Sequence, residues 1–165
     1  MFYINRMSLI LLGTMLLGIS TVNAQDAHGD KIGLQLSPGL MELLRAEMRE
    51  LLIGVQSLPA GIATADWEKV AETSAQINAS YILARKLTPE QRKELGTSLP
   101  THFKRMDAQF HLEAKKLEAA ARNHDAQLSS FYYYRMLESC TACHTAYAPS
   151  RFPGFLPIGK QPHGH

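Results

Sequence analysis

The residues best suited to chemistry lie in one short segment, residues 140–144, which read Cys-Thr-Ala-Cys-His. Both cysteines of the 165-residue chain are in this segment. Two thiols separated by two residues and followed by a histidine form the attachment motif of c-type haem. Each thiol adds to one haem vinyl group and forms a thioether, and the histidine turns an imidazole nitrogen towards the iron. On a helix, Cys140, Cys143 and His144 would stand at positions i, i+3 and i+4 and would share one face.

The same cysteine pair has two other chemical interpretations. In thioredoxin-like proteins a Cys-x-x-Cys pair forms a redox disulfide at the N-terminus of a helix that follows a strand. Here the pair lies near the end of a long helical pattern, and the sequence has no strand alternation. A zinc site needs four ligands, often two such pairs, whereas this chain has two cysteines and scattered histidines. Covalent haem is the leading interpretation, with a thiol-disulfide oxidoreductase as the alternative from another class.

Composition sets broad limits. A length of 165 residues fits one domain, and 45% apolar with 19% charged residues is ordinary for a globular protein. The formal charge of +2 and the absence of a basic stripe give no indication of a nucleic-acid partner. The seven methionines matter more, because a thioether sulfur can bind haem iron.

Residues 1–24 have the order of a secretory signal peptide. Arg6 supplies the positive charge, residues 7–19 are mainly apolar, and Val-Asn-Ala at residues 22–24 fits a cleavage site. We expect the exported chain to begin at Gln25, with no membrane attachment after cleavage; an uncleaved anchor is the alternative. Export agrees with the haem motif, because Gram-negative bacteria attach c-type haem outside the cytoplasm, and it predicts a periplasmic protein.

Four later stretches have the apolar spacing of amphipathic helices. The first begins with Ser-Pro at residues 37–38, a favourable N-cap and first-turn pair, and ends at Leu-Pro-Ala-Gly, residues 58–61. The second is capped by Thr64, carries Asp66 in its first turn, and fades at Leu87.

A short connecting helix and two long helices follow. Residues 88–91, Thr-Pro-Glu-Gln, form a capping box, and Gly96 stops the short helix. The third long helix begins near residues 98–100 and ends at Asn-His-Asp, residues 123–125, whose aspartate is the next N-cap. The fourth covers about residues 126–147 and is stopped by the proline two residues later.

Helices of about 20 residues are about 30 Å long, and mostly short connections favour antiparallel neighbours. We therefore predict an all-α fold: an antiparallel four-helix bundle over residues 37–148, with a haem site at its C-terminal end and an irregular tail over residues 149–165. In this topology the fourth helix returns beside the first half of the first helix.

This arrangement resembles the class II c-type cytochromes, that is, the cytochrome c prime group and its low-spin relatives. The resemblance covers about residues 37–155, and the position of the motif near the C-terminus is its informative feature, since most c-type cytochromes carry it near the N-terminus. It implies one covalent haem c, attached through Cys140 and Cys143, with His144 as the proximal iron ligand.

The chain departs from that family just after the motif. Members often have an aromatic and then a basic residue three and four places after the histidine; Tyr147 matches the first, but Ala148 stands at the second. Arg151 is a candidate substitute. Residues 147–155 are unlike the prototype and are expected to fold back over the haem edge.

The family places its distal residue on the first helix. Met48 is the preferred sixth ligand and Met41, one heptad earlier on the same face, is the runner-up; either could instead be core packing. Arg45 is a candidate partner for a haem propionate, with a solvated helix charge as the alternative.

Other side chains near the motif have weaker indications. Phe131 and Tyr132 are candidates for the wall of the haem site. His111 follows Asp107 by four residues, so the two are expected to hydrogen-bond as a structural pair rather than to bind iron.

The functional expectation is an exported cytochrome, not an enzyme, that carries single electrons between redox partner proteins. The resemblance also implies a homodimer as a candidate assembly. The first alternative is a five-coordinate haem protein that binds nitric oxide or carbon monoxide. The second is the thiol-disulfide oxidoreductase already described.

Overall fold

The computed structural model describes residues 33–157, so the predicted signal peptide and residues 158–165 lie outside it. The predicted all-α class is confirmed for this part, in which six α-helices pack together and no strand occurs. No described helix is long and apolar enough to cross a membrane. The elements are α1 (Pro38–Thr64), α2 (Trp67–Ala79), α3 (Leu83–Lys86), α4 (Pro89–Ser98), α5 (Thr101–Arg122), α6 (Ala126–Tyr147) and the 3-10 helix η1 (Pro153–Phe155).

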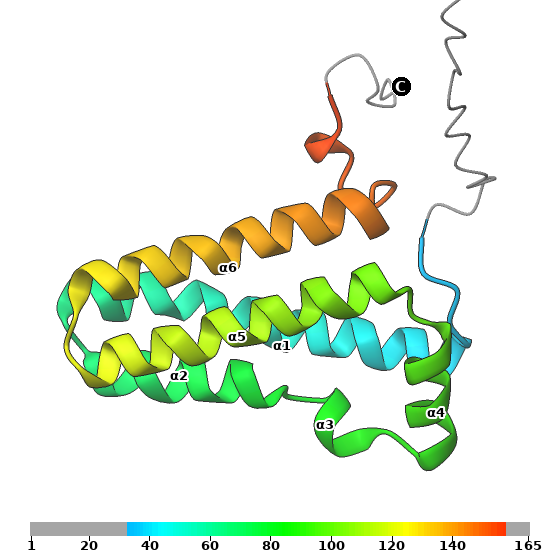
Figure 1. The fold of residues 1–165 in the computed structure, drawn as a ribbon, viewed down its shortest axis with the longest axis horizontal. Helices are drawn as coiled ribbons and strands as arrows, with labels where there is room; N and C mark the ends of the chain where they lie inside the picture. Colours follow the sequence, from blue (N-terminus) through cyan, green and yellow to red (C-terminus); the bar gives the residue numbers. More distant parts are fainter. Residues whose placement is uncertain (1–32, 158–165) are drawn as a thin grey trace, which may run out of the picture.

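The four longest helices lie alongside one another, and each runs opposite to the one before it (Figure 1). The helix α5 packs along α2 on one side and α6 on the other, while α1 packs along α2 and touches α6 over a smaller area. The short helices α3 and α4 connect α2 to α5. The shared core is apolar and contains Leu51, Val55, Leu58, Val70, Ala71, Ile77, Phe110, Ala114, Leu117, Ala121 and Met136.

The helix α1 extends beyond its predicted end. It continues through Pro59 to Thr64, so the prediction that residues 58–61 terminate it is wrong. A proline inside a helix removes one backbone hydrogen bond, but Leu58 and Gly61 on either side are buried, and this packing holds the chain in helical form. The helix ends at Ala65, whose φ of 58° is in the left-handed region.

The boundaries of α2 also differ from prediction. Asp66, not Thr64, is the N-cap, and its carboxylate accepts a hydrogen bond of 3.3 Å from the Lys69 N–H. Thr64 instead donates its hydroxyl to the Ala60 carbonyl at 2.9 Å. The helix stops at Ala79 rather than fading at residue 87, because the next amides have another partner.

That partner is Glu47 of α1, which is 2% exposed. Its carboxylate accepts hydrogen bonds from the backbone N–H groups of Tyr81, Ile82 and Leu83, at 2.9, 2.5 and 3.0 Å. Burial alone would raise the pKa of Glu47, but these hydrogen bonds outweigh it and hold the pKa below its usual value. The carboxylate therefore ends α2 and fixes the start of α3.

The starts of α4 and α6 follow local capping signals, whereas the end of α4 does not. The capping box at α4 is confirmed: Thr88 accepts from the Gln91 N–H at 3.2 Å, and Gln91 accepts from the Thr88 N–H at 3.1 Å. The helix passes through Gly96 to Ser98, so the prediction that this glycine stops it is wrong. Asp125 is confirmed as the N-cap of α6 and accepts from the Leu128 N–H at 2.9 Å.

Candidate functional site

Cys140, Cys143 and His144 lie in the last two turns of α6, which are fastened to the start of α5. The fastening residue is Tyr147, whose hydroxyl is 3.0 Å from Nδ1 of His102. Its ring also packs edge-on against Phe103, with 5.2 Å between the centroids. The motif is therefore presented by a helix end that is held in place.

Both thiols are free and partly buried, and Cys140 packs against the core. Burial raises the pKa of the Cys140 thiol. Burial also raises the pKa of Cys143, to about 11, with added repulsion from Asp107 and Cys140. The C-terminal end of a helix adds negative potential, which further disfavours a thiolate. Both cysteines are thus protonated at neutral pH.

The His144 ring is covered by the segment that follows α6. Phe152 stacks on it with 4.2 Å between centroids and 13° between planes, and Phe155 lies at 6.4 Å and 21°. Burial lowers the pKa of His144, and the positive charge of Arg151 lowers it further. The imidazole is therefore held neutral, which is the form that binds a metal. Residues 147–155 fold back onto this ring, and their expected position over a haem edge stays a prediction.

The methionines of α1 lie on a flank turned away from α2. A Cβ added at Gly54 would lie 2.7 Å from Oη of Tyr81, and one added at Gly61 would lie 2.7 Å from Cγ2 of Val70. Because Val70 belongs to α2 and Tyr81 follows the end of that helix, the two glycines mark the side of α1 that faces α2. An α-helix turns by about 100° per residue. Met48 and Met41 therefore lie beyond the other edge of the row of buried residues on α1, on the side towards α6. Met41 is partly buried, and Met48 is 37% exposed.

The first half of α1 and the last half of α6 lie at the same end of the molecule (Figure 1). On α6, Tyr132 and Tyr147 face α5. Helical spacing puts His144 and Leu137 at the other edge of the buried stripe, towards α1. Helical spacing therefore puts His144 and the two candidate methionines at the same end of the molecule, on the flanks of α6 and α1 that are turned towards each other.

Arg45 is exposed on the outer side of this region. Its guanidinium lies 3.9 Å from the Glu42 carboxylate, which Arg49 also approaches at 3.3 Å. Exposed pairs of this kind contribute little to stability, so the Arg45 side chain can exchange this partner for another anion at low cost.

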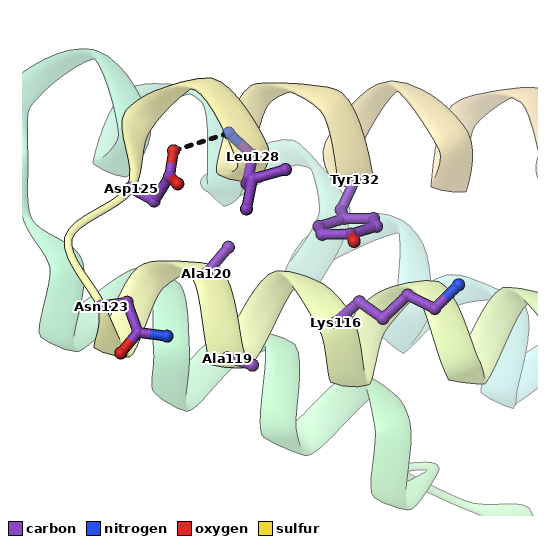
Figure 2. A pocket seen from close by; sticks show the side chains of 7 residues that line it. All are labelled: Lys116, Ala119, Ala120, Asn123, Asp125, Leu128 and Tyr132. Carbon is purple, nitrogen blue, oxygen red and sulfur yellow. Dashed lines mark hydrogen bonds between the residues drawn. The ribbon is translucent and has the colours of Figure 1, made fainter.

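Phe131 and Tyr132 are not brought to the motif. They precede Cys140 by more than two turns, about 12 Å along the helix axis, and Phe131 is 51% exposed. Tyr132 lines an open hollow at the α5–α6 loop, where the Lys116 ammonium lies 5.7 Å from its ring centroid (Figure 2). This hollow is at the opposite end of α6 from the motif.

His111 and Asp107 form a looser pair than expected, with 3.7 Å between Nε2 and Oδ1. The short contact of His111 is from Nδ1 to the Ile77 carbonyl, 2.8 Å, in which the ring N–H donates. Partial burial raises the pKa of Asp107, opposed by His111 and reinforced by Glu47. The pair therefore joins α5 to α2, in keeping with a structural role.

Sequence reasoning missed Glu47, Phe152 and Phe155. One signal for Glu47 was present: it occupies an apolar row with Leu40, Leu44 and Leu51, a spacing that buries a side chain. Phe152 and Phe155 carried no such signal, because they lie in a segment without helical periodicity. Among residues 33–157, no group of three or more His, Cys, Asp or Glu side chains is placed to hold a bare metal ion.

Comparison with known protein families, with curated proteins and with solved structures finds no match to this chain.

Proposed function

We propose that this protein is an exported electron-transfer cytochrome with one haem c, attached through Cys140 and Cys143 and bound at iron by His144. The observation that carries the proposal is the presentation of two free thiols and a neutral imidazole on the last two turns of one helix. Thioether formation consumes both thiols and needs no disulfide. When bound, the haem supplies reversible one-electron chemistry; the chain supplies attachment, ligands and burial.

The helix arrangement supports a class II architecture. In this proposal α1, α2, α5 and α6 are the four helices of an antiparallel bundle, and the haem lies between the facing flanks of α1 and α6. Those flanks expose apolar side chains, among them Met48, Leu52 and Leu137. Such a surface is costly in water and suits an apolar macrocycle.

The thiol-disulfide alternative is disfavoured by the electrostatics of the cysteines. A thiol that attacks disulfides has a lowered pKa, commonly at a helix N-terminus or beside a cation. Here the pKa of Cys143 is raised to about 11, and both cysteines are near the C-terminus of α6. Thiolate nucleophiles would be scarce at neutral pH.

The proposed distal ligand is Met48, with Met41 as the runner-up. A thioether sulfur is a soft ligand that favours ferrous iron and raises the reduction potential relative to a second imidazole. Tyr147 fastens the end of α6, which carries His144, to the start of α5. Ligands held on two packed helices move little between oxidation states, which suits electron transfer. The proposal also includes cleavage after residue 24 and release of the chain into the periplasm. There it would exchange electrons with redox partner proteins and assemble as a homodimer.

Replacing each methionine in turn tests this function. In Met48→Ala we expect the absorption spectrum of the haem-loaded protein to change from low spin to high spin, and the reduced form to bind carbon monoxide readily. Met41→Ala is the matched control, one heptad away on the same flank, and should leave the spectrum unchanged. A parent protein that is already high-spin and takes up carbon monoxide at once would favour the gas-binding alternative. A high-spin shift in Met41→Ala alone would assign the sixth ligand to Met41.

A further inference from the structure

The segment after α6 is folded into a compact reversal by backbone hydrogen bonds. The Ala148 N–H donates to the His144 carbonyl at 2.9 Å, and the Ala148 carbonyl accepts from Arg151 and Phe152 at 3.0 and 3.1 Å. The 3-10 helix η1 then continues the turn, with the Phe155 N–H donating to the Phe152 carbonyl at 3.2 Å. The chain is therefore carried back towards α6 instead of away from it.

The reversal delivers two phenyl rings to one imidazole. The centroids of His144, Phe152 and Phe155 form a triangle, with 4.2, 6.4 and 6.1 Å between the pairs. The plane of Phe152 is within 13° of the imidazole plane, so the two rings are stacked face to face with little tilt. Rotation of the imidazole about its own side-chain bond would break this contact.

This stacking replaces the usual means of orienting a metal-binding histidine. Such a histidine ordinarily donates its second ring N–H to a carboxylate, a carbonyl or water, which fixes the ring plane. Within residues 33–157, the recorded contacts of the His144 ring are the two stacks, and no side chain hydrogen-bonds to its nitrogens. The ring plane is set by aromatic packing.

We propose that Phe152, supported by Phe155, is a positioning residue that fixes the plane of the His144 imidazole and covers the proximal side of the site. This inference rests on the proposed function, since it assigns the covered imidazole to iron. It adds a role for residues 148–155, the part of the chain that departs from the family pattern.

The test uses proton NMR of the ferric, haem-loaded protein, in which the spread of the haem methyl shifts reports the orientation of the axial imidazole plane. In Phe152→Ala we expect a rearranged methyl pattern and a lower reduction potential, because water reaches the proximal side, with the haem mass unchanged. Phe152→Tyr should restore the parent pattern. Tyr134→Ala, which removes an exposed ring elsewhere on α6, should match the parent.

The outcomes separate the inference from the proposed function. If haem is attached and Phe152→Ala has the parent methyl pattern and potential, the positioning role is refuted while the cytochrome stands. If the parent chain takes up no haem, both proposals fall. Should Phe152→Ala fail to accumulate, Phe152→Leu keeps apolar volume without a planar ring and should give the same rearrangement.

Discussion

Glu47 and Glu113 are two glutamates buried in the helix packing, with exposed fractions of 2% and 3%. The Glu47 carboxylate accepts from three backbone N–H groups. Oε1 of Glu113 accepts from Gln109 and from Lys116, but Oε2 has no hydrogen-bond partner among the described residues. A buried charge stabilises only when its hydrogen-bonding capacity is filled, so the two positions should respond differently to substitution.

For Glu47→Gln we expect a loss of about 2–3 kcal/mol in the free energy of unfolding at pH 7, because an amide replaces one acceptor oxygen by a donor that faces N–H groups. Urea titration followed by circular dichroism measures it. Glu113→Gln is the matched control at the incompletely paired position and should cost less. Equal losses for the two variants would show that the backbone N–H groups bonded to Glu47 add no stability beyond that of the incompletely paired Glu113.

The loss in Glu47→Gln should also depend on pH. Since the folded-state pKa of Glu47 lies below its usual value of 4.5, the carboxylate stabilises the fold fully above pH 4.5. That contribution disappears as the pH falls through the lower folded-state pKa. The stability gap between parent and Glu47→Gln should therefore narrow below pH 4.5. A gap of constant size down to pH 2 would contradict this assignment.

The sequence singles out Cys140, Cys143 and His144 as a candidate haem site because the motif spans five consecutive residues, and this assignment stays a prediction. Sequence reasoning does not identify Glu47, whose hydrogen-bond partners are 34 to 36 residues away. It predicts that residues 147–155 fold back, but not that Phe152 stacks on His144. Contacts made across a turn or between helices depend on tertiary packing, which periodicity does not specify.

The same distinction holds for helix boundaries. The starts of α4 and α6 follow from capping residues that bond within the first turn, Thr88 and Asp125. The ends of α1 and α2 depend on packing: α1 passes through Pro59, and α2 stops where Glu47 takes over the next amides. These two ends were predicted wrongly because a neighbouring element can move the point at which a helix stops.

Glycine substitutions test the close contact between α1 and α2. A Cβ at Gly61 would lie 2.7 Å from Cγ2 of Val70, a branched side chain with little freedom to move. Gly61→Ala should therefore destabilise the protein by about 1–3 kcal/mol, although alanine is the better helix former. Gly96→Ala in α4, where a Cβ meets nothing within 4 Å, should stabilise by up to about 1 kcal/mol.

Thermal or urea unfolding of both glycine variants measures the contrast. The sign of the difference is the informative quantity, since both substitutions gain the same helical propensity. A stabilising Gly61→Ala would mean that α1 and α2 can separate at low cost, and the account of Pro59 being held within α1 by packing would then fail.

For the whole molecule, the antiparallel order of the four long helices brings the start of α1 and α5 to the end of α6 (Figure 1). The motif therefore lies at the end of the molecule where α1 and α5 begin, while the hollow at the α5–α6 loop is at the other end. The sequence predicts this arrangement through helix number and loop length. It does not predict the smaller contact of α1 with α6 than with α2, which depends on how tightly side chains pack.

The central claim is that Cys140 and Cys143 hold one haem covalently. The most direct test is the intact mass of the purified chain, produced together with a c-type haem attachment system, beside a Cys140→Ala/Cys143→Ala double variant produced in the same way. We predict that the parent carries the mass of one haem, retained after denaturation, and that the double variant has only its polypeptide mass. A parent chain that carries no haem mass under these conditions would contradict the claim.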